Sequence, residues 1–192
     1  GRDWQQGSRL KNSHGHCRSR ANAGIAGDKD TATRDAALSM WGGRVAAVFG
    51  DLLVAQPAGA VQAMIYGKPI DAGVKGARAG FRRDVEGIFL VGPWPVGVGG
   101  RSSILRTNAL VAGPRGLAVR YGHSHAKPVD LLEELIASCP PGVIADPFAG
   151  SGSTLVAAKY QGRRAIGVEL EERHCERAAQ RLATPDLFGA AS

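Results

Sequence analysis

The sequence predicts an α/β fold with a mostly parallel sheet covered by helices on both faces. Near the C-terminal end, the apolar runs 143–145 and 165–170 have the character of buried strands, and helical patterns follow them after Gly152 and over 171–182. Strands that alternate with helices favour a parallel sheet, because each helix carries the chain back across the sheet. A length of 192 residues with 44% hydrophobic content suits one domain.

The upstream elements are predicted from caps, apolar periodicity and glycine or proline boundaries. A helix over 30–41 begins at Asp30 or Thr31, both good N-caps. A second helix over 128–138 carries an apolar stripe and stops at a Pro-Pro-Gly run. Strands are predicted at 45–49, 61–66 and 88–91.

Composition divides the chain into parts. We expect a flexible basic N-terminal segment at 1–29, a folded domain over 30–184 and a free tail at 185–192. Within the domain, 92–122 is rich in glycine and proline and reads as one long loop region. Loops of that length are uncommon unless they are functional or disordered.

The charge of the chain is unevenly distributed. The net charge is +7, and residues 87–129 contain no Asp or Glu. That acid-free stretch carries Arg101, Arg106, Arg115, Arg120 and Lys127. A one-sided basic surface suits a polyanion such as DNA. A generally basic, arginine-rich proteome is the other explanation, and charge alone does not separate the two.

Cysteine usage and hydropathy favour a cytoplasmic protein. Three widely spaced cysteines suggest reduced thiols, and no stretch has the pattern of a membrane span or signal peptide. The His-Gly-His-Cys run at 14–17 has no second cluster to complete a metal site, so we expect no metal. The chain starts at Gly1 instead of methionine, which indicates a processed product or a fragment.

A glycine-rich turn, Asp-Pro-Phe-Ala-Gly-Ser-Gly-Ser-Thr over 146–154, joins a predicted strand to its helix. Such a turn lets the backbone approach a ligand closely. The next predicted strand carries Glu169, and an acid about 20 residues after the turn suits ribose hydroxyls. Together they predict a pocket for a nucleoside-containing cofactor.

The side chains of the turn narrow the choice of cofactor. No lysine precedes Ser153, so a phosphate-binding P-loop fits poorly, and Leu155 replaces the third glycine of the dinucleotide motif. Asp146 is unfavourable beside a pyrophosphate but compatible with a cationic sulfonium. The turn therefore favours S-adenosylmethionine over NAD, while an ordinary strand–helix junction remains an alternative.

Four segments, two of them described above, stand in a recognisable order. His-Ser-His-Ala-Lys-Pro at 123–128 precedes a helix from Val129, then come the turn at 146–154 and Gly-Val-Glu at 167–169. This combination resembles the C-terminal half of the DNA N-methyltransferases that act on adenine N6 or cytosine N4, in their permuted motif order. The helix over 171–182 is similar to the closing helix of that family.

The sequence also departs from the family pattern. Ser124 stands where the family usually has proline, and Ser153 where it usually has threonine. The family's Asp/Asn/Ser-Pro-Pro-aromatic loop does not occur in these 192 residues, because the run at 139–142 is Cys-Pro-Pro-Gly. We therefore expect no catalytic residue in the chain, and our hypothesis is that the loop preceded Gly1.

The resemblance implies a Rossmann-like S-adenosylmethionine-dependent methyltransferase domain over 30–184, incomplete at its N-terminus, with 92–122 as a short DNA-recognition region. It implies that Glu169 holds both ribose hydroxyls, Phe148 lies against the adenosine and Thr154 contacts the methionine part. The implied cofactor residues are Asp146, Phe148, Gly150, Ser151, Gly152, Thr154, Glu169, His123 and Lys127. The implied phosphate contacts are Arg101, Arg106, Arg115 and Arg120.

The implied activity is methyl transfer from S-adenosylmethionine to the exocyclic amine of adenine or cytosine in double-stranded DNA. A restriction endonuclease partner would suit such an enzyme, but the sequence does not identify one. Two alternatives stay open: an inactive remnant that binds cofactor or DNA, and an NAD-dependent oxidoreductase, which Phe148, Leu155 and the basic loop disfavour. For Glu169, the structural alternative is a strand-end acid that caps the next helix.

Overall fold

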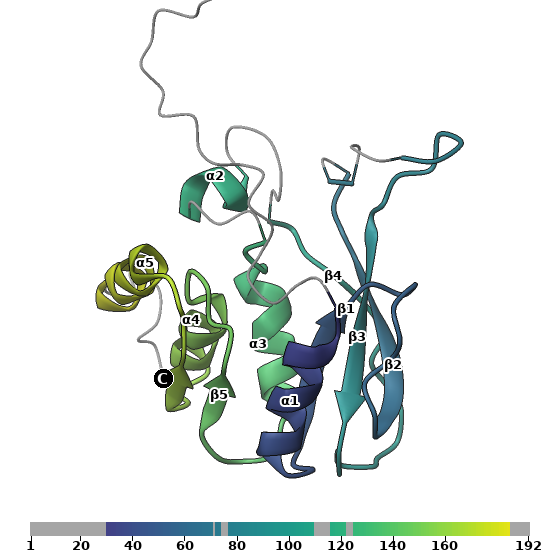
Figure 1. The fold of residues 1–192 in the computed structure, drawn as a ribbon, viewed down its shortest axis with the longest axis horizontal. Helices are drawn as coiled ribbons and strands as arrows, with labels where there is room; N and C mark the ends of the chain where they lie inside the picture. The colour runs from purple at the N-terminus through teal and green to yellow at the C-terminus, as the bar shows by residue number, and fades with distance from the viewer. Residues whose placement is uncertain (1–29, 71, 74–76, 110–115, 122–124, 185–192) are drawn as a thin grey trace, which may run out of the picture.

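The computed structural model describes residues 30–70, 72–73, 77–109, 116–121 and 125–184 (Figure 1). The predicted flexible segment at 1–29 and tail at 185–192 lie outside these residues. The described helices are α1 (Ala32–Trp41), α2 (Leu117–Tyr121), α3 (Val129–Ser138), α4 (Ser153–Tyr160) and α5 (Glu172–Ala183). The strands are β1 (Ala46–Gly50), β2 (Ala60–Gly67), β3 (Val85–Val91), β4 (Ile104–Arg106), β5 (Ile144–Asp146) and β6 (Ala165–Gly167).

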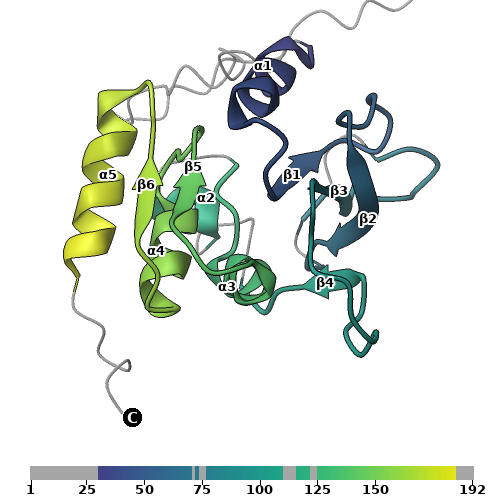
Figure 2. The ribbon, with the colours of Figure 1, turned by 90° about the horizontal axis from the view of Figure 1, so that it is seen from below.

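The strands form two sheets, and the predicted mostly parallel sheet is wrong. The larger sheet has the order β1-β3-β2-β4, in which β3 runs antiparallel to both neighbours and only β4 is parallel to β2. The smaller sheet pairs β5 with β6 in parallel. Figure 2 shows α3 between the two sheets. The fold is α/β, with a mixed main sheet.

The connections between strands explain this difference. Residues 68–84 join β2 to β3 without an intervening helix among those described. Antiparallel neighbours can be joined by a loop, whereas parallel neighbours need a crossover, usually a helix. Strand–helix alternation begins only at β5. The expectation that strands joined through a helix pair in parallel therefore applies to β5 and β6 but not to the strands before them.

Most predicted elements are present close to their predicted positions. Two described elements were not predicted, β4 and α2, and both fall within 92–122. Their sequences, Ile-Leu-Arg and Leu-Ala-Val-Arg-Tyr, are too short to show a period of two or of 3.6 residues. β6 is also shorter than the predicted strand over 165–170, because it pairs with only three residues of β5.

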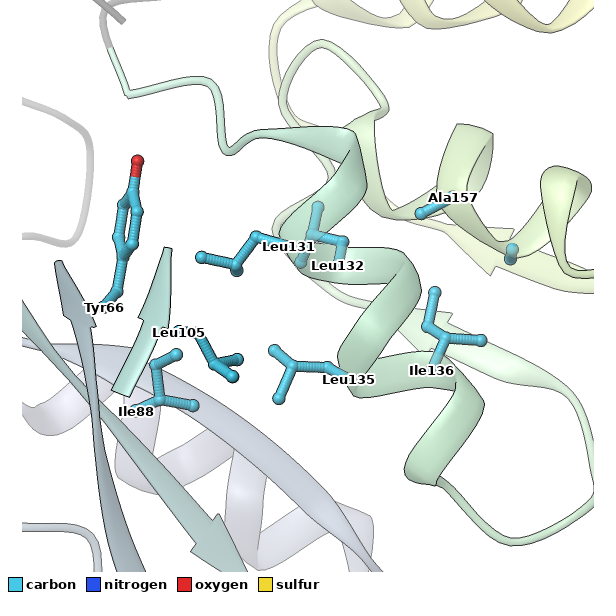
Figure 3. Close-up of a cluster of buried hydrophobic side chains, with 9 residues drawn as sticks. Tyr66, Ile88, Leu105, Leu131, Leu132, Leu135, Ile136 and Ala157 are labelled. Atoms are coloured by element: carbon cyan, nitrogen blue, oxygen red, sulfur yellow. The ribbon is translucent and has the colours of Figure 1, made fainter. Parts of the chain in front are cut away.

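The apolar stripe of α3 is packed on two sides. Leu131 and Leu135 point toward the main sheet, where they meet Tyr66, Ile88 and Leu105 (Figure 3). Ile136 faces α4, where Ala157 is fully buried (Figure 3). Small alanines on α4 let the two helices approach closely. α3 therefore joins the two sheets into one core.

Polar side chains hold both ends of α3. At its start, the Asp130 carboxylate accepts hydrogen bonds from the Thr107 hydroxyl at 2.7 and 2.8 Å, which ties the end of β4 to the helix. Beyond its last turn, Arg163 donates to the carbonyls of Gly142 and Pro140, each at 2.8 Å. A guanidinium offers five donors in a rigid fork, so one side chain satisfies several carbonyls after a helix end.

We predict that Leu131→Ala lowers the free energy of unfolding by about 2–5 kcal/mol, because it opens a cavity between α3 and the main sheet. Urea denaturation followed by circular dichroism would measure this loss. Leu53→Ala is the matched control, since Leu53 is 92% exposed and its variant should stay within about 0.5 kcal/mol of the unsubstituted chain. Equal losses in both variants would contradict the two-sided packing of α3.

Candidate functional site

The glycine turn lies at the carboxyl ends of β5 and β6. Asp146, the last residue of β5, pairs with Gly167, the last residue of β6. Past these ends, the Val168 amide donates to the Asp146 carbonyl and the Ala149 amide donates to the Val168 carbonyl, both at 2.9 Å. The turn therefore folds over the end of β6. In open parallel sheets, this edge is where ligands bind.

Glu169 and the turn are brought together, as the sequence predicts. The Gly150 amide donates to Glu169 Oε2 at 2.8 Å, and the Glu171 amide donates to Oε1 at 2.9 Å. A carboxylate has about four lone-pair sites, so each oxygen retains acceptor capacity beyond its amide bond. The half-buried carboxylate links the turn to the end of β6 and can still accept hydrogen bonds from a ligand.

The same hydrogen bonds control the ionisation of Glu169. Partial burial raises the pKa of Glu169, but hydrogen bonds from the amides of Glu171, Gly150 and Leu170 act in the opposite direction. The nearby His174 also favours the ionised form. The net result is a pKa below the ordinary value for a glutamate, so the site presents a full negative charge at neutral pH.

The two predicted glycines have positive φ angles, at 51° for Gly150 and 79° for Gly152. L-residues with side chains rarely adopt such angles. At Gly152 a Cβ atom would also lie 2.7 Å from the Cβ of Ala178 on α5. Gly152 is therefore required for the close packing of α5 against the turn, whatever the turn binds.

Phe148 and Asp146 occupy the rim of the turn. Phe148 is 57% exposed, so it is not a core aromatic and is open to a ligand contact. The Asp146 carboxylate accepts from the Phe148 amide at 3.0 Å and so caps the turn. Thr154 is half-buried in the first turn of α4, whereas Ser151 is only 2% exposed.

Lys127 makes contacts that the sequence did not suggest. Its ammonium forms an ion pair with Glu86 on β3 and lies 4.8 Å from the centre of the Phe49 ring. Lys68 is also near the other oxygen of Glu86, at 3.5 Å. Lys127 thus joins the segment before α3 to the main sheet, and its predicted role toward a cofactor stays a prediction. The other residue predicted from this motif, His123, lies outside the described residues.

The predicted phosphate-binding arginines do not form one cluster. Arg101 donates to the Ser138 hydroxyl at 2.6 Å, at the C-terminal end of α3. Arg106 ends β4, next to Thr107, which is bonded to the N-terminal end of α3. Ten helical residues, about 15 Å, therefore separate the two ends. Arg120 is exposed on α2, and the predicted Arg115 lies outside the described residues.

Arg181 is the main residue of the site that the sequence analysis missed. Its guanidinium donates to the Ser151 carbonyl at 2.7 Å and lies 3.8 Å from the centre of the Tyr121 ring. A signal was available: His174 and Ala178 are buried on α5, and Arg181 continues that face at spacings of four and three. Helical periodicity would have placed Arg181 inward.

The described residues contain neither a membrane-spanning helix nor a cluster of metal ligands. No described helix has the length and apolar character needed to cross a membrane. No group of three His, Cys, Asp or Glu side chains within the described ranges could hold a metal ion. The predicted cytoplasmic location and the expectation of a metal-free site stay predictions.

Comparison with known proteins tests the resemblance to DNA methyltransferases. Residues 102–181 match the model of a family described as DNA methylase. The resemblance to DNA methyltransferases is confirmed. The matched range, the methylase segment from here on, contains the glycine turn, Glu169 and Arg181.

Individual relatives match the chain over short stretches. YubD of Escherichia coli (strain K12), named as a methylase, is 52% identical over 63 residues, which are 32% of this chain and 28% of YubD. Type II methyltransferase M.ScaI of Streptomyces caespitosus is 40% identical over 70 residues, 35% of this chain and 23% of M.ScaI. The chain thus matches less than a third of the length of either curated relative.

Among solved structures, the crystal structure of an M1.HpyAVI–SAM complex aligns with a TM-score of 0.48 and 24% identity. The alignment covers 65% of this chain and 63% of that chain. The assignment of the methylase segment rests on the sequence match.

We predict that Glu169→Gln lowers the free energy of unfolding by about 1 kcal/mol at neutral pH, because the amide replaces a charged acceptor of two backbone hydrogen bonds. The folded-state pKa of Glu169 lies below its unfolded value, so the carboxylate stabilises the fold above the unfolded pKa. This advantage is lost as the pH falls through the folded pKa. Urea denaturation over a series of pH values would therefore show the two stabilities converging in acid.

The matched control is Glu176→Gln, an exposed carboxyl on the outside of α5. Its effect should stay within about 0.5 kcal/mol at every pH. A stability gap for Glu169→Gln that persists unchanged in acid would show that the carboxylate charge does not stabilise the turn.

Proposed function

We propose that this chain carries the cofactor half of an S-adenosylmethionine-dependent DNA N-methyltransferase that methylates the exocyclic amine of adenine (N6) or cytosine (N4). The observation that carries the proposal is the Glu169 carboxylate, held by the Gly150 amide at 2.8 Å at the mouth of the glycine turn. The match of residues 102–181 to the DNA methylase model supports methyl transfer as the reaction of this site.

The acceptors of Glu169 fit a ribose. The Gly150 amide bonds Oε2 and the Glu171 amide bonds Oε1, and a carboxylate with about four lone-pair sites retains acceptor capacity for a ligand. Two vicinal hydroxyls present two donors with a similar spacing, so a carboxylate can accept both at once. Because its pKa is lowered, Glu169 is ionised at neutral pH, and hydrogen bonds to an ionised acceptor are the stronger kind.

The rest of the rim fits a cationic nucleoside. Asp146 contributes a second negative charge beside the turn, and it lies at the end of β5, next to the end of β6. The exposed Phe148 ring offers an apolar face for an adenine. Two carboxylates with one exposed ring suit a sulfonium-bearing nucleoside better than the pyrophosphate of NAD.

The chemistry requires more than a cofactor pocket. S-adenosylmethionine supplies a methyl group activated by its positively charged sulfur. The exocyclic amine of a base is a weak nucleophile, since its lone pair is delocalised into the ring, so the base must leave the duplex and be aligned with that methyl group. The side chains described above bind and orient the cofactor. None of them is assigned as the acceptor for the amine protons.

The proposal extends to the organisation of the chain. Residues 30–184 would form the methyltransferase domain with a Rossmann-like arrangement around β5 and β6, and 92–122 would face DNA. Within that region Arg106 and Arg120 are the proposed phosphate contacts at the N-terminal end of α3, and Arg101 is a third at its other end. The segments at 1–29 and 185–192 would lie outside the domain.

A binding-only role is the second candidate, because the Asp/Asn/Ser-Pro-Pro-aromatic sequence does not occur in the 192 residues. Both candidates share the cofactor pocket and differ in turnover. Binding measurements therefore test the shared part first, and methyl transfer to duplex DNA by the chain tests the difference.

We predict that the chain binds S-adenosylhomocysteine, the product of methyl transfer, and that Glu169→Ala weakens this binding at least about tenfold by removing two charge-assisted hydrogen bonds. Isothermal titration calorimetry would measure both affinities, with NAD as the competing ligand. Glu176→Ala is the control, because it removes an exposed carboxylate from the same part of the chain.

Three results would count against the proposal. Binding of NAD in place of S-adenosylhomocysteine would favour the oxidoreductase. Equal effects of Glu169→Ala and Glu176→Ala would show only a general loss of negative charge. The absence of binding by a chain that unfolds cooperatively would show that these residues do not form a cofactor pocket.

We also predict that the chain binds duplex DNA with an affinity that falls steeply as salt increases, because phosphate contacts release counterions. Arg106→Gln and Arg120→Gln should each reduce the slope of log affinity against log salt by about 1. Fluorescence anisotropy with a labelled duplex would measure the slopes. Arg101→Gln shows whether DNA reaches the other end of α3, and exposed Arg164→Gln, before β6, is the control. A flat salt dependence would exclude phosphate binding by these arginines.

A further inference from the structure

Arg181 is bonded to the wall of the glycine turn. Besides the Ser151 carbonyl at 2.7 Å, its Nη1 lies 3.3 Å from the Ser151 hydroxyl and 3.2 Å from the Ser153 hydroxyl. Both serines are buried. One nitrogen of Arg181 therefore holds the turn between Gly150 and the start of α4, next to the Gly150 amide that donates to Glu169.

The same guanidinium contacts α2. Its central carbon lies 3.8 Å from the centre of the Tyr121 ring, a stacking distance. Tyr121 ends α2, which lies in the basic region between β4 and α3, beyond the N-terminal end of α3 (Figure 1). Arg181 thus touches the turn with its edge and α2 with its face.

The burial of Arg181 increases the strength of both contacts. Burial lowers the pKa of Arg181, and its interactions with the Tyr121 and Tyr160 side chains oppose that effect. An arginine in a protein remains charged at neutral pH. A charged group removed from water needs its partners, so a change in one contact alters the cost of keeping the other.

We propose that Arg181 is a positioning residue that couples the cofactor turn to α2, so that cofactor binding at the turn and DNA binding beside α2 strengthen each other. This inference rests on the proposed function. A ligand that orders the turn also orders the Arg181 side chain, which is bonded to the turn. The ordered guanidinium then holds the Tyr121 ring against it in one position. Coupling between two sites is reciprocal, so DNA that orders α2 raises cofactor affinity by the same factor.

The first test needs no ligand. Hydrogen exchange would follow the α2 amides of Val119 and Arg120, which bond the carbonyl of Gly116 just before that helix, and the amide of Gly152, which bonds the Ala149 carbonyl in the turn. In Arg181→Gln all three should exchange faster than in the unsubstituted chain. Arg177→Gln makes the same charge change at an exposed position of α5 and should leave them unchanged.

Variants of Tyr121 separate coupling from simple support of the turn. Tyr121→Leu removes the stacked ring but leaves every hydrogen bond between Arg181 and the serines available, whereas Tyr121→Phe keeps the ring. We expect faster exchange at Gly152 in Tyr121→Leu and near-normal exchange in Tyr121→Phe. These variants also cover the case in which Arg181→Gln does not fold.

The second test measures the coupling itself by titrating S-adenosylhomocysteine with and without duplex DNA. DNA should raise the affinity of the unsubstituted chain and of Tyr121→Phe by about fivefold or more, and that of Tyr121→Leu and Arg181→Gln by less than about twofold. Arg181→Gln should in addition bind the ligand about tenfold more weakly without DNA.

The outcomes distinguish the inference from the function on which it rests. If the unsubstituted chain binds no S-adenosylhomocysteine, the proposed function fails, and hydrogen exchange still decides whether Arg181 links the turn to α2. If it binds but Tyr121→Leu behaves like the unsubstituted chain in both tests, the coupling is overturned and Arg181 only supports the turn.

Discussion

The packing of α3 is the interaction on which the rest of the structure depends. Its stripe of Leu131, Leu132, Leu135 and Ile136 is buried on both sides, against the main sheet and against α4. Burial of large aliphatic side chains stabilises a fold by about 1.5–3 kcal/mol each. Without α3 the main sheet and the β5–β6 pair would share little surface, so the position of the glycine turn relative to β4 and α2 depends on this helix.

The glycine turn is then held by two side chains from outside it. Glu169 accepts from the Gly150 amide, and Arg181 donates to the Ser151 carbonyl. The Glu169 carboxylate is anionic and accepts hydrogen bonds, whereas the Arg181 guanidinium is cationic and donates them. The two side chains therefore favour different groups of a ligand or of a neighbouring element. A turn held at two neighbouring residues by side chains from outside it is preorganised, and preorganisation lowers the entropy lost on binding.

The contacts of Arg181 join the glycine turn to α2 in the basic region. An enzyme acting on a base in duplex DNA gains from binding cofactor and DNA in concert, since an extruded base without a methyl donor is unproductive. A stacked arginine couples the two without a large rearrangement. Its geometry needs a planar guanidinium, which lysine does not provide.

Part of the candidate site was predictable because its signals are local in sequence. The turn at 146–154 and Glu169 are separated by one strand–helix–strand unit, and such units bring the carboxyl ends of parallel strands to one edge. The helices α1, α3, α4 and α5 were predictable for a similar reason, since each has its own caps, breakers or apolar period. In contrast, β4 and α2 are too short to carry a period and are stabilised by their neighbours.

The sequence by itself determined four of the five described helices, most strands, the glycine turn and the family resemblance, because these depend on residues close together in the chain. Only the tertiary structure decided the antiparallel position of β3, the ion pair of Lys127 with Glu86, and the contact of Arg181 with Tyr121. Lys127 and Glu86 are 41 positions apart in the sequence, and Arg181 and Tyr121 are 60 positions apart. No local sequence pattern specifies contacts between residues so far apart, because these contacts follow from how whole elements pack around α3.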